Sequence, residues 1–153
     1  GKFAIEKGIP TILDYFTKKI SEDIMRDHGQ AKFITATNVF AHIDNVNQIT
    51  ELILNLLHDD GVFISESHYL LPLIETLQYD TIYHEHYSYL SLLTVQTIFE
   101  ANGLSVFDVE ELSTHGGSLR VYAQRSDFGK NEVSENVNLL KYNFFYEKYR
   151  LFL

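Results

Sequence analysis

Apolar side chains recur at helical spacing in four segments of the chain. The second segment places Ile20, Ile24 and Met25 on one face, and the third repeats isoleucine and leucine in the same way. Asn102-Gly103, directly after the fourth segment, is a common helix ending. The pattern therefore predicts helices over residues 2–7, 17–27, 46–57 and 94–101.

Short runs rich in β-branched and apolar residues alternate with these helices. The run over residues 31–37 carries few charges, as expected for a strand that is covered on both faces. Two later runs are separated by the segment 113–117, a spacing that suits an antiparallel pair at the end of a sheet. The predicted strands are residues 11–13, 31–37, 62–65, 104–112 and 118–124.

From the first predicted strand onward, the order of elements is β-α-β-α-β-α-β-β. Strands that alternate with helices predict an α/β domain with a mostly parallel sheet, here ending in an antiparallel pair. A length of 153 residues with 45% hydrophobic content suffices for one globular domain. Residues 135–153 read as an aromatic helix without an ending signal, and residues 1–8 as the tail of a helix. We therefore expect a fragment of a longer protein.

The amino-acid composition excludes some classes of binding partner. The formal net charge is -9 at pH 7, and lysine and arginine do not cluster anywhere in the sequence. This argues against binding to nucleic acid or to an anionic membrane. The sequence has no cysteine, and no apolar run reaches the roughly 18 residues of a membrane span. We expect a soluble cytoplasmic protein without disulfides or thiolate metal sites.

Residues 79–91 concentrate groups that can exchange protons. The segment holds several tyrosines, two histidines, two acidic residues and three hydroxyl side chains, among one isoleucine and one leucine. A hydrophobic core does not need this composition. Because the unperturbed pKa of imidazole lies near physiological pH, we expect a general base in this segment.

The conformation of this segment decides which side chains can act together. In a helix, Tyr83 and His86 share a face. In an extended chain His84 and His86 share a face instead, and a His-x-His pair can begin a metal site. The tyrosines could also form a structural stripe, with rings inside and hydroxyls at the edge. The residues alone leave these interpretations open.

Polar side chains follow three successive predicted strands. Open α/β sheets bind ligands beyond the carboxyl ends of their strands, so these side chains are candidates for a site. Asp14 and Asn38 could equally serve as helix caps or as solvated loop residues. The polar side chains in question are Asp14, Tyr15, Asn38, His42, Glu66 and His68.

Three motifs, together with the order of elements, resemble a known enzyme family. They are similar to class I S-adenosylmethionine-dependent methyltransferases, and within that class to sugar C-methyltransferases that act on nucleotide-linked 4-keto deoxysugars. The resemblance covers residues 8 to 125. The motifs are Asn38-Val39-Phe40-Ala41-His42-Ile43, Tyr79-Asp80-x-x-Tyr83-x-Glu85-His86-x-Ser88-Tyr89 and His115-Gly116-Gly117-Ser118-Leu119-Arg120.

The resemblance implies a partial Rossmann-like methyltransferase domain over residues 1–130, truncated at its N-terminal side, and the start of a C-terminal domain over residues 131–153. It implies S-adenosyl-L-methionine as cofactor and a nucleotide-linked deoxysugar as substrate. Members of the family begin with a cysteine-rich zinc domain and a glycine-rich cofactor loop, which this sequence lacks. Zinc is therefore expected only in that absent N-terminal domain.

The resemblance also implies catalytic roles. Methylation of a carbon next to a ketone requires proton removal, stabilisation of an enolate and alignment with the methyl donor. His86 is the expected base, and Tyr83 is expected to donate to the sugar or to the enolate oxygen. Glu85 is expected to hold a sugar hydroxyl or to orient an imidazole. His42 is expected between the cofactor and the sugar, as a proton relay or donor.

The remaining implied roles concern the cofactor and the sheet. Asp14 and Tyr15 are expected to contact the adenine, and Asn38 to line the cofactor cleft. For Arg120 we expect a structural role in the antiparallel strand rather than contact with nucleotide phosphates. Methyl transfer itself needs no metal, because the methyl donor is a strong electrophile.

Other functions remain open at this point. A methyltransferase of the same fold could act on oxygen or nitrogen of a small molecule. A hydrolase or lyase could bind a metal through His84 and His86, with His42 or His115 as a further ligand. The tyrosine-rich segment could also be an interaction surface without catalytic function.

Overall fold

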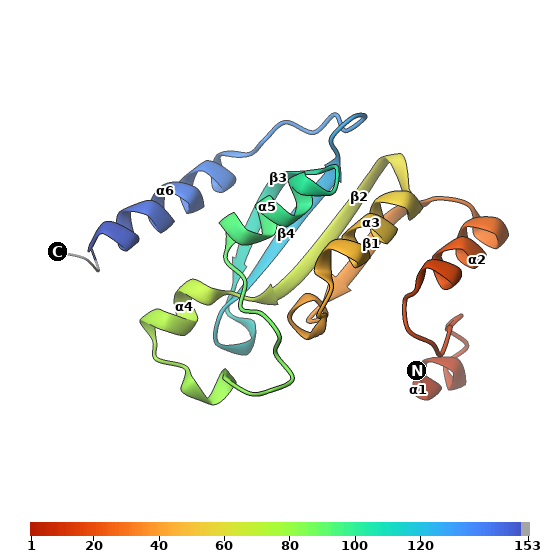
Figure 1. The fold of residues 1–153 in the computed structure, drawn as a ribbon, viewed down its shortest axis with the longest axis horizontal. Coiled ribbons are helices and arrows are strands. Elements are labelled where there is room, and N and C mark those ends of the chain that lie inside the picture. The colour runs from red at the N-terminus through yellow and green to blue at the C-terminus, as the bar shows by residue number, and fades with distance from the viewer. Residues whose placement is uncertain (151–153) are drawn as a thin grey trace.

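A four-stranded sheet forms the centre of the computed structural model, which describes the backbone of residues 1–150 and the side chains of residues 1–142 (Figure 1). The strand order is β1-β2-β4-β3. β1 and β2 are parallel, whereas β4 is antiparallel to both β2 and β3. The strands are β1 (Ala31–Thr37), β2 (Leu57–His68), β3 (Leu104–Leu112) and β4 (Ser118–Arg125).

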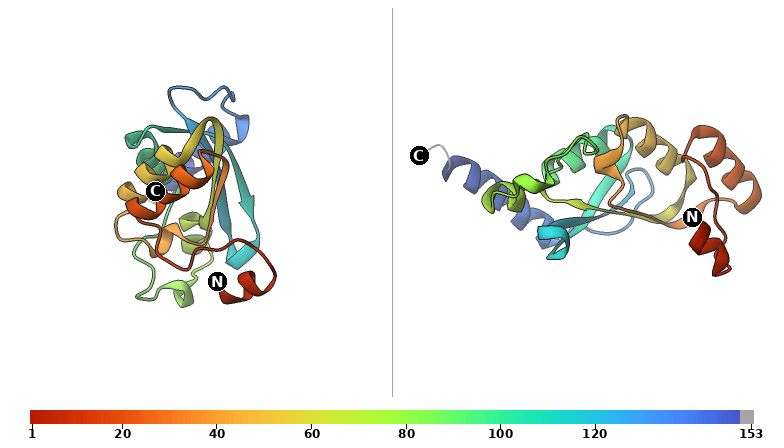
Figure 2. Two further views of the ribbon diagram at one scale, coloured as in Figure 1. Left: turned by 90° about the vertical axis from the view of Figure 1, so that its right-hand side faces the viewer. Right: turned by 90° about the horizontal axis from the view of Figure 1, so that it is seen from below.

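Helices cover one face of this sheet. The two that lie directly over it are α3 and α5, and α2 lies on the same side (Figure 2). Thr17, Asn45 and Ser91 begin α2, α3 and α5, because their side-chain oxygens accept a backbone N–H three residues later. The helical elements are α1 (Lys2–Glu6), α2 (Lys18–His28), η1 (Phe40–His42), α3 (Val46–Leu56), α4 (Leu70–Glu75), η2 (Tyr79–Thr81), α5 (Leu92–Ala101), η3 (Thr114–Gly116) and α6 (Glu135–Arg150), where η marks a 3-10 turn.

The predicted α/β class with a terminal antiparallel pair is confirmed, and the sheet is mixed because β1 and β2 form its only parallel pair within residues 1–150. The predicted helices and the strands after residue 30 are present with small changes at their ends. The strand predicted over 62–65 extends over all of β2. None of the described helices is long and apolar enough to cross a membrane.

The strand predicted over residues 11–13 is wrong. These residues form irregular chain between α1 and α2, and none of the strands in the described part pairs with them. Pro10 cannot donate a backbone hydrogen bond, and the Thr11 hydroxyl donates locally to the Ile9 carbonyl at 2.8 Å. A strand needs a neighbour for its N–H and C=O groups, and apolar residues alone do not supply one.

Three phenylalanines hold the loop after β1 against the sheet. Phe40 of η1, Phe63 of β2 and Phe99 of α5 are at most 1% exposed, and their ring centroids lie 5.4 to 5.9 Å apart. Val137 and Leu140 at the start of α6 are buried in the same core. The division into domains at residue 130 stays a prediction, and residues 151–153 of the predicted aromatic helix lie outside the described part.

An ion-pair network crosses three strands of the sheet. The guanidinium of Arg120 donates to the carboxylate of Glu66 at 2.9 and 3.1 Å and to that of Glu110 at 3.1 Å. Glu66 is buried, with 10% of its side chain exposed. Its carboxylate raises the pKa of Arg120, so the arginine stays charged. Arg120 therefore has the structural role expected from the sequence.

We expect Arg120→Met to lower the free energy of unfolding by about 2 kcal/mol, because the carboxylate of Glu66 loses its partner while it remains buried. Urea unfolding of the protein at its full encoded length measures this. Arg26→Met is the matched control, since Arg26 pairs with Asp23 and Asp27 on the exposed face of α2 and its loss should change nothing measurable. Equal effects of the two substitutions would contradict the structural role of Arg120.

Candidate functional site

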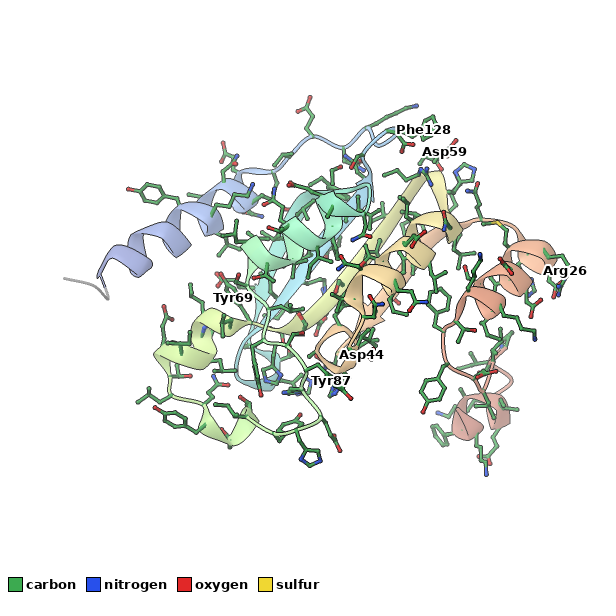
Figure 3. All side chains as sticks on the ribbon, viewed as in Figure 1. Arg26, Asp44, Asp59, Tyr69, Tyr87 and Phe128 are labelled. Carbon is green, nitrogen blue, oxygen red and sulfur yellow. The ribbon has the colours of Figure 1, made fainter. Side chains whose placement is uncertain are left out.

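Three loops meet at the edge of the sheet where β1 and β2 end (Figure 1). They are the η1 loop after β1, the segment 69–91 after β2 and the η3 turn between β3 and β4. Asp44 and Tyr87 are labelled at this edge, far from Asp59 and Phe128 at the other end of the sheet (Figure 3). Open α/β sheets bind ligands at the carboxyl ends of their strands, so this edge is the place to look for a site.

Backbone hydrogen bonds fix the segment 69–91 in place. The N–H of Leu70 donates to the carbonyl of Leu90 at 3.0 Å, which closes the segment into a loop. The N–H of Tyr87 donates to the carbonyl of Ala41 at 2.7 Å, which joins the segment to η1. These bonds join the loop after β1 and the loop after β2 into one continuous surface, the wall of the cavity described next.

This wall and the η3 turn enclose a cavity of about 170 Å³. Five predicted site residues from three separate parts of the sequence line it together. None of the lining residues is lysine or arginine, and most can donate or accept a hydrogen bond. The cavity is lined by Asn38, Ala41, His42, Ser67, His68, Tyr83, His86 and His115.

Tyr83 and His86 form a hydrogen-bonded pair in this cavity. The Nδ1 atom of His86 lies 3.1 Å from the carbonyl oxygen of Thr81, which can only accept, so Nδ1 carries the proton. The Nε2 atom therefore offers a lone pair, and the hydroxyl of Tyr83 donates to it at 2.9 Å. The ring centroids are 4.1 Å apart. Nε2 of His86 therefore faces the cavity wall formed by Tyr83.

A turn, not a helix, brings this pair together. The N–H of His86 donates to the carbonyl of Tyr83 at 3.1 Å, with His84 and Glu85 at the corner. The contact of side chains three residues apart, expected for a helix, is present although the segment is not helical. His84 is exposed and does not line the cavity, so the face shared by two histidines in an extended chain does not form.

His42 lies against His86, with ring centroids 4.8 Å apart. Its Nδ1 atom donates to the backbone carbonyl of Glu85 at 2.9 Å, which leaves Nε2 as an acceptor. The backbone carbonyl of Glu85 thus orients the imidazole of His42. The carboxylate of Glu85 is exposed and is not among the groups that line the cavity.

Of the three predicted cofactor residues, only one lines the cavity. Asn38 lines the cavity and adopts a positive φ of 54°, which asparagine tolerates better than most residues. Asp14 and Tyr15 lie in the loop before α2, and Tyr15 is 86% exposed. Neither of them lines the cavity, so their contact with an adenine stays a prediction.

Two further histidines line the cavity: His68, a candidate from its place at a strand end, and His115, which the sequence suggested only as a metal ligand. His68 is the last residue of β2, and its Nε2 atom donates to the carbonyl of His115 at 2.6 Å. The ring centroid of His68 lies 5.8 Å from that of His86 and 5.9 Å from that of His115. Two signals pointed to them: the place of His68 at a strand end, and the glycine pair that follows His115.

Tyr69 fixes the start of the segment 69–91. It is 1% exposed, and burial raises the pKa of its phenol to about 12, with smaller contributions from Glu111 and Glu75. Its hydroxyl has no hydrogen-bond partner in the described part of the chain. Tyr69 therefore stays neutral at physiological pH and serves as a buried anchor rather than as a reactive group.

The histidines of the cavity do not form a metal site. Among the residues whose side chains are described, no group of three or more His, Cys, Asp or Glu is arranged to hold a metal ion. Each of the nitrogens His42 Nδ1, His68 Nε2 and His86 Nδ1 donates to a backbone carbonyl. The geometry favours hydrogen bonding and proton transfer.

Comparison with known proteins agrees with this geometry. A family model described as a methyltransferase domain matches residues 8–109. The chain belongs to this methyltransferase domain family. A curated relative, the C-methyltransferase NovU of Streptomyces niveus, is 41% identical over 120 residues, which are 78% of this chain and 29% of the relative. The chain thus spans less than a third of the length of that relative.

Solved methyltransferases share the fold. An S-adenosylmethionine-dependent methyltransferase from Clostridium acetobutylicum is similar with a TM-score of 0.54 at 10% identity, over 81% of this chain and 68% of its own. Magnesium protoporphyrin IX methyltransferase from Synechocystis PCC 6803, solved with bound S-adenosylhomocysteine, gives 0.50 at 18% identity, over 68% and 49%. These likenesses show a Rossmann-like class I methyltransferase fold.

The η3 turn supplies a test of the cavity wall. In Gly117→Ala, the added methyl group would lie 2.8 Å from Cβ of Pro72, and the residue has a φ of 126°. We expect this substitution to lower the free energy of unfolding by about 1–3 kcal/mol more than Gly29→Ala does. Gly29 also has a positive φ, 77°, but its added methyl group meets nothing within 4 Å. Urea unfolding compares the two, and equal losses would contradict the packing of Pro72 on the turn.

Proposed function

We propose that the chain carries the sugar-binding side of an S-adenosyl-L-methionine-dependent C-methyltransferase. The methyl group would go to a carbon next to the keto group of a nucleotide-linked deoxysugar. The observation that carries the proposal is the pair of His86 and Tyr83 in the lining of a polar cavity, with Nδ1 of His86 held by the carbonyl of Thr81 and Nε2 beside the hydroxyl of Tyr83. The similarity to a C-methyltransferase over 78% of the chain supports the same reaction.

The residues present fit the reacting end of the cofactor. The methyl donor supplies an electrophilic methyl group on a positively charged sulfur when it is bound. The cavity offers imidazole lone pairs and hydroxyl oxygens and has no cationic side chain in its lining, so it tolerates positive charge. Asn38 and His42 would lie beside this group. A volume of about 170 Å³ suits the reacting atoms only, because sites for whole cofactors are several times larger.

His86 is the proposed base. Transfer to carbon needs a carbanion-like nucleophile, and the C–H bond next to a ketone is acidic enough to supply one. The sugar would take the place of the Tyr83 hydroxyl at Nε2, so that Nε2 receives the proton. The hydrogen bond from Nδ1 to the carbonyl of Thr81 then stabilises the imidazolium and keeps the ring in position.

Tyr83 is proposed to stabilise the enolate that this step forms. Its hydroxyl lies 2.9 Å from Nε2 and can turn from that nitrogen to the neighbouring keto oxygen of the sugar. A donor aimed at the oxygen where charge develops lowers the barrier most. His42, oriented by the carbonyl of Glu85 and packed against His86, would bind a sugar hydroxyl through its Nε2.

The remaining roles rest on the resemblance alone. Asp14 and Tyr15 would contact the adenine, and the carboxylate of Glu85 would hold a sugar hydroxyl. The acidic charge and the absence of cysteine support a cytoplasmic enzyme that acts on a small molecule and has no nucleic-acid or membrane partner.

His86→Asn tests the base. The asparagine amide can keep the hydrogen bond to the carbonyl of Thr81 and removes only the basic nitrogen. We expect the turnover number to fall by about 10²–10⁴-fold, while the dissociation constant for S-adenosylhomocysteine changes little. Steady-state methyl transfer to a nucleotide-linked 4-keto deoxysugar and calorimetric titration measure the two quantities, with the protein at its full encoded length.

His84→Asn is the control, because His84 is an exposed neighbour that does not line the cavity. It should leave both quantities unchanged. A mild effect of His86→Asn on turnover would point instead to transfer onto oxygen or nitrogen, for which alignment can suffice. An equal loss of cofactor affinity would contradict the assignment of His86 as the base.

A further inference from the structure

One basic nitrogen in the cavity has no part in the proposed transfer. His68 donates from Nε2 to the carbonyl of His115, so its lone pair is on Nδ1. In the described part of the chain, Nδ1 of His68 has no hydrogen-bond partner. Its ring is half-buried in the cavity wall between the rings of His86 and His115, at 5.8 and 5.9 Å. The ring of His68 is therefore a direct neighbour of the ring of His86 in the cavity wall.

The carbonyl that orients His68 is held in a costly conformation. His115 has φ 53° and ψ 33°, a left-handed conformation that a residue with a side chain rarely adopts. The turn persists because the amide of Gln78 donates to the carbonyl of Gly116 at 2.7 Å, and the hydroxyl of Ser118 donates to that of Thr114 at 3.0 Å. The turn is therefore conformationally strained, and its carbonyl fixes the tautomer of His68.

The proposed reaction creates a need for such a group. The C–H bond of the sugar breaks, the C–CH3 bond forms and the S–CH3 bond breaks, with its electron pair going to sulfur. The proton from carbon remains on Nε2 of His86. One proton per turnover must therefore leave the cavity. It cannot leave through Nδ1, which already donates to the carbonyl of Thr81.

We propose that His68 receives this proton from His86 on its Nδ1 and passes it to solvent beside the exposed His115. The inference rests on the proposed function. His42 lies closer to His86, but its free nitrogen is assigned to the sugar there. His68 acts through His86 and not on the sugar, so it is a relay residue whose loss should slow the exchange of the base with solvent.

His68→Gln separates proton removal by His86 from the later transfer of that proton to solvent. The glutamine amide can keep the hydrogen bond to the carbonyl of His115 and has no basic atom. Two measurements are made on the protein at its full encoded length. The first is exchange of the sugar C–H for deuterium in heavy water with S-adenosylhomocysteine bound. The second is methyl transfer in a single turnover. Thymidine diphosphate 4-keto-6-deoxyglucose and its uridine analogue are the probes.

We expect deuterium exchange to slow by at least about tenfold in His68→Gln, while methyl transfer in the single turnover keeps its rate. The first turnover needs only the base, since the proton can stay on His86 until it ends. His84→Gln should change neither rate. In His68→Ala, added imidazole should restore exchange, because a free base can then occupy the vacated space.

Unchanged exchange in His68→Gln, with active unaltered protein, overturns the relay and leaves the proposed function in place. An equal loss of exchange and single-turnover transfer also overturns it, because His68 would then act on substrate binding or on proton removal itself. If the unaltered protein neither exchanges nor methylates either probe, the proposed function fails and the relay falls with it.

Discussion

The hydrogen bond from His86 Nδ1 to the carbonyl of Thr81 determines what the rest of the site can do. It fixes the tautomer, and with it the position of the one lone pair that faces Tyr83. A carbonyl can only accept, so the ring cannot turn over without losing this bond. The imidazoles of His42 and His68 are oriented in the same way, because each donates a hydrogen bond to a backbone carbonyl. The cavity is therefore lined by imidazoles of fixed orientation, which suits proton transfer next to a cationic methyl donor.

The fold holds these carbonyls in place from three directions. The phenylalanine cluster fixes η1, and with it His42, to β2 and α5. The bond between Tyr87 and Ala41 holds the segment that carries His86. The η3 turn is held by Gln78 of that same segment. A change in any one of the three loops should thus alter the others, because hydrogen bonds join the segment 69–91 to both of the other loops.

Sequence patterns predicted the described α-helices except α4, the strands of the sheet, and five of the eight residues that line the cavity. The patterns succeeded for contacts within one short segment, such as the contact between Tyr83 and His86, which are three residues apart. They failed for residues 11–13, because apolar composition does not reveal whether a neighbouring strand is available. They did not predict the contact between His68 and His115, which depends on the left-handed turn at η3 and on the pairing of β2 with β4. The use of the Glu85 carbonyl in place of its carboxylate was equally invisible, since every residue has a carbonyl.

A crystal structure of the full-length protein with S-adenosylhomocysteine and a nucleotide-linked 4-keto deoxysugar tests the central claim most directly. The account predicts that the carbon next to the keto group lies about 3–3.5 Å from His86 Nε2. It also predicts that the Tyr83 hydroxyl has moved from this nitrogen to the keto oxygen. A sugar bound with that carbon outside the cavity, and with Tyr83 still donating to His86, would contradict the account.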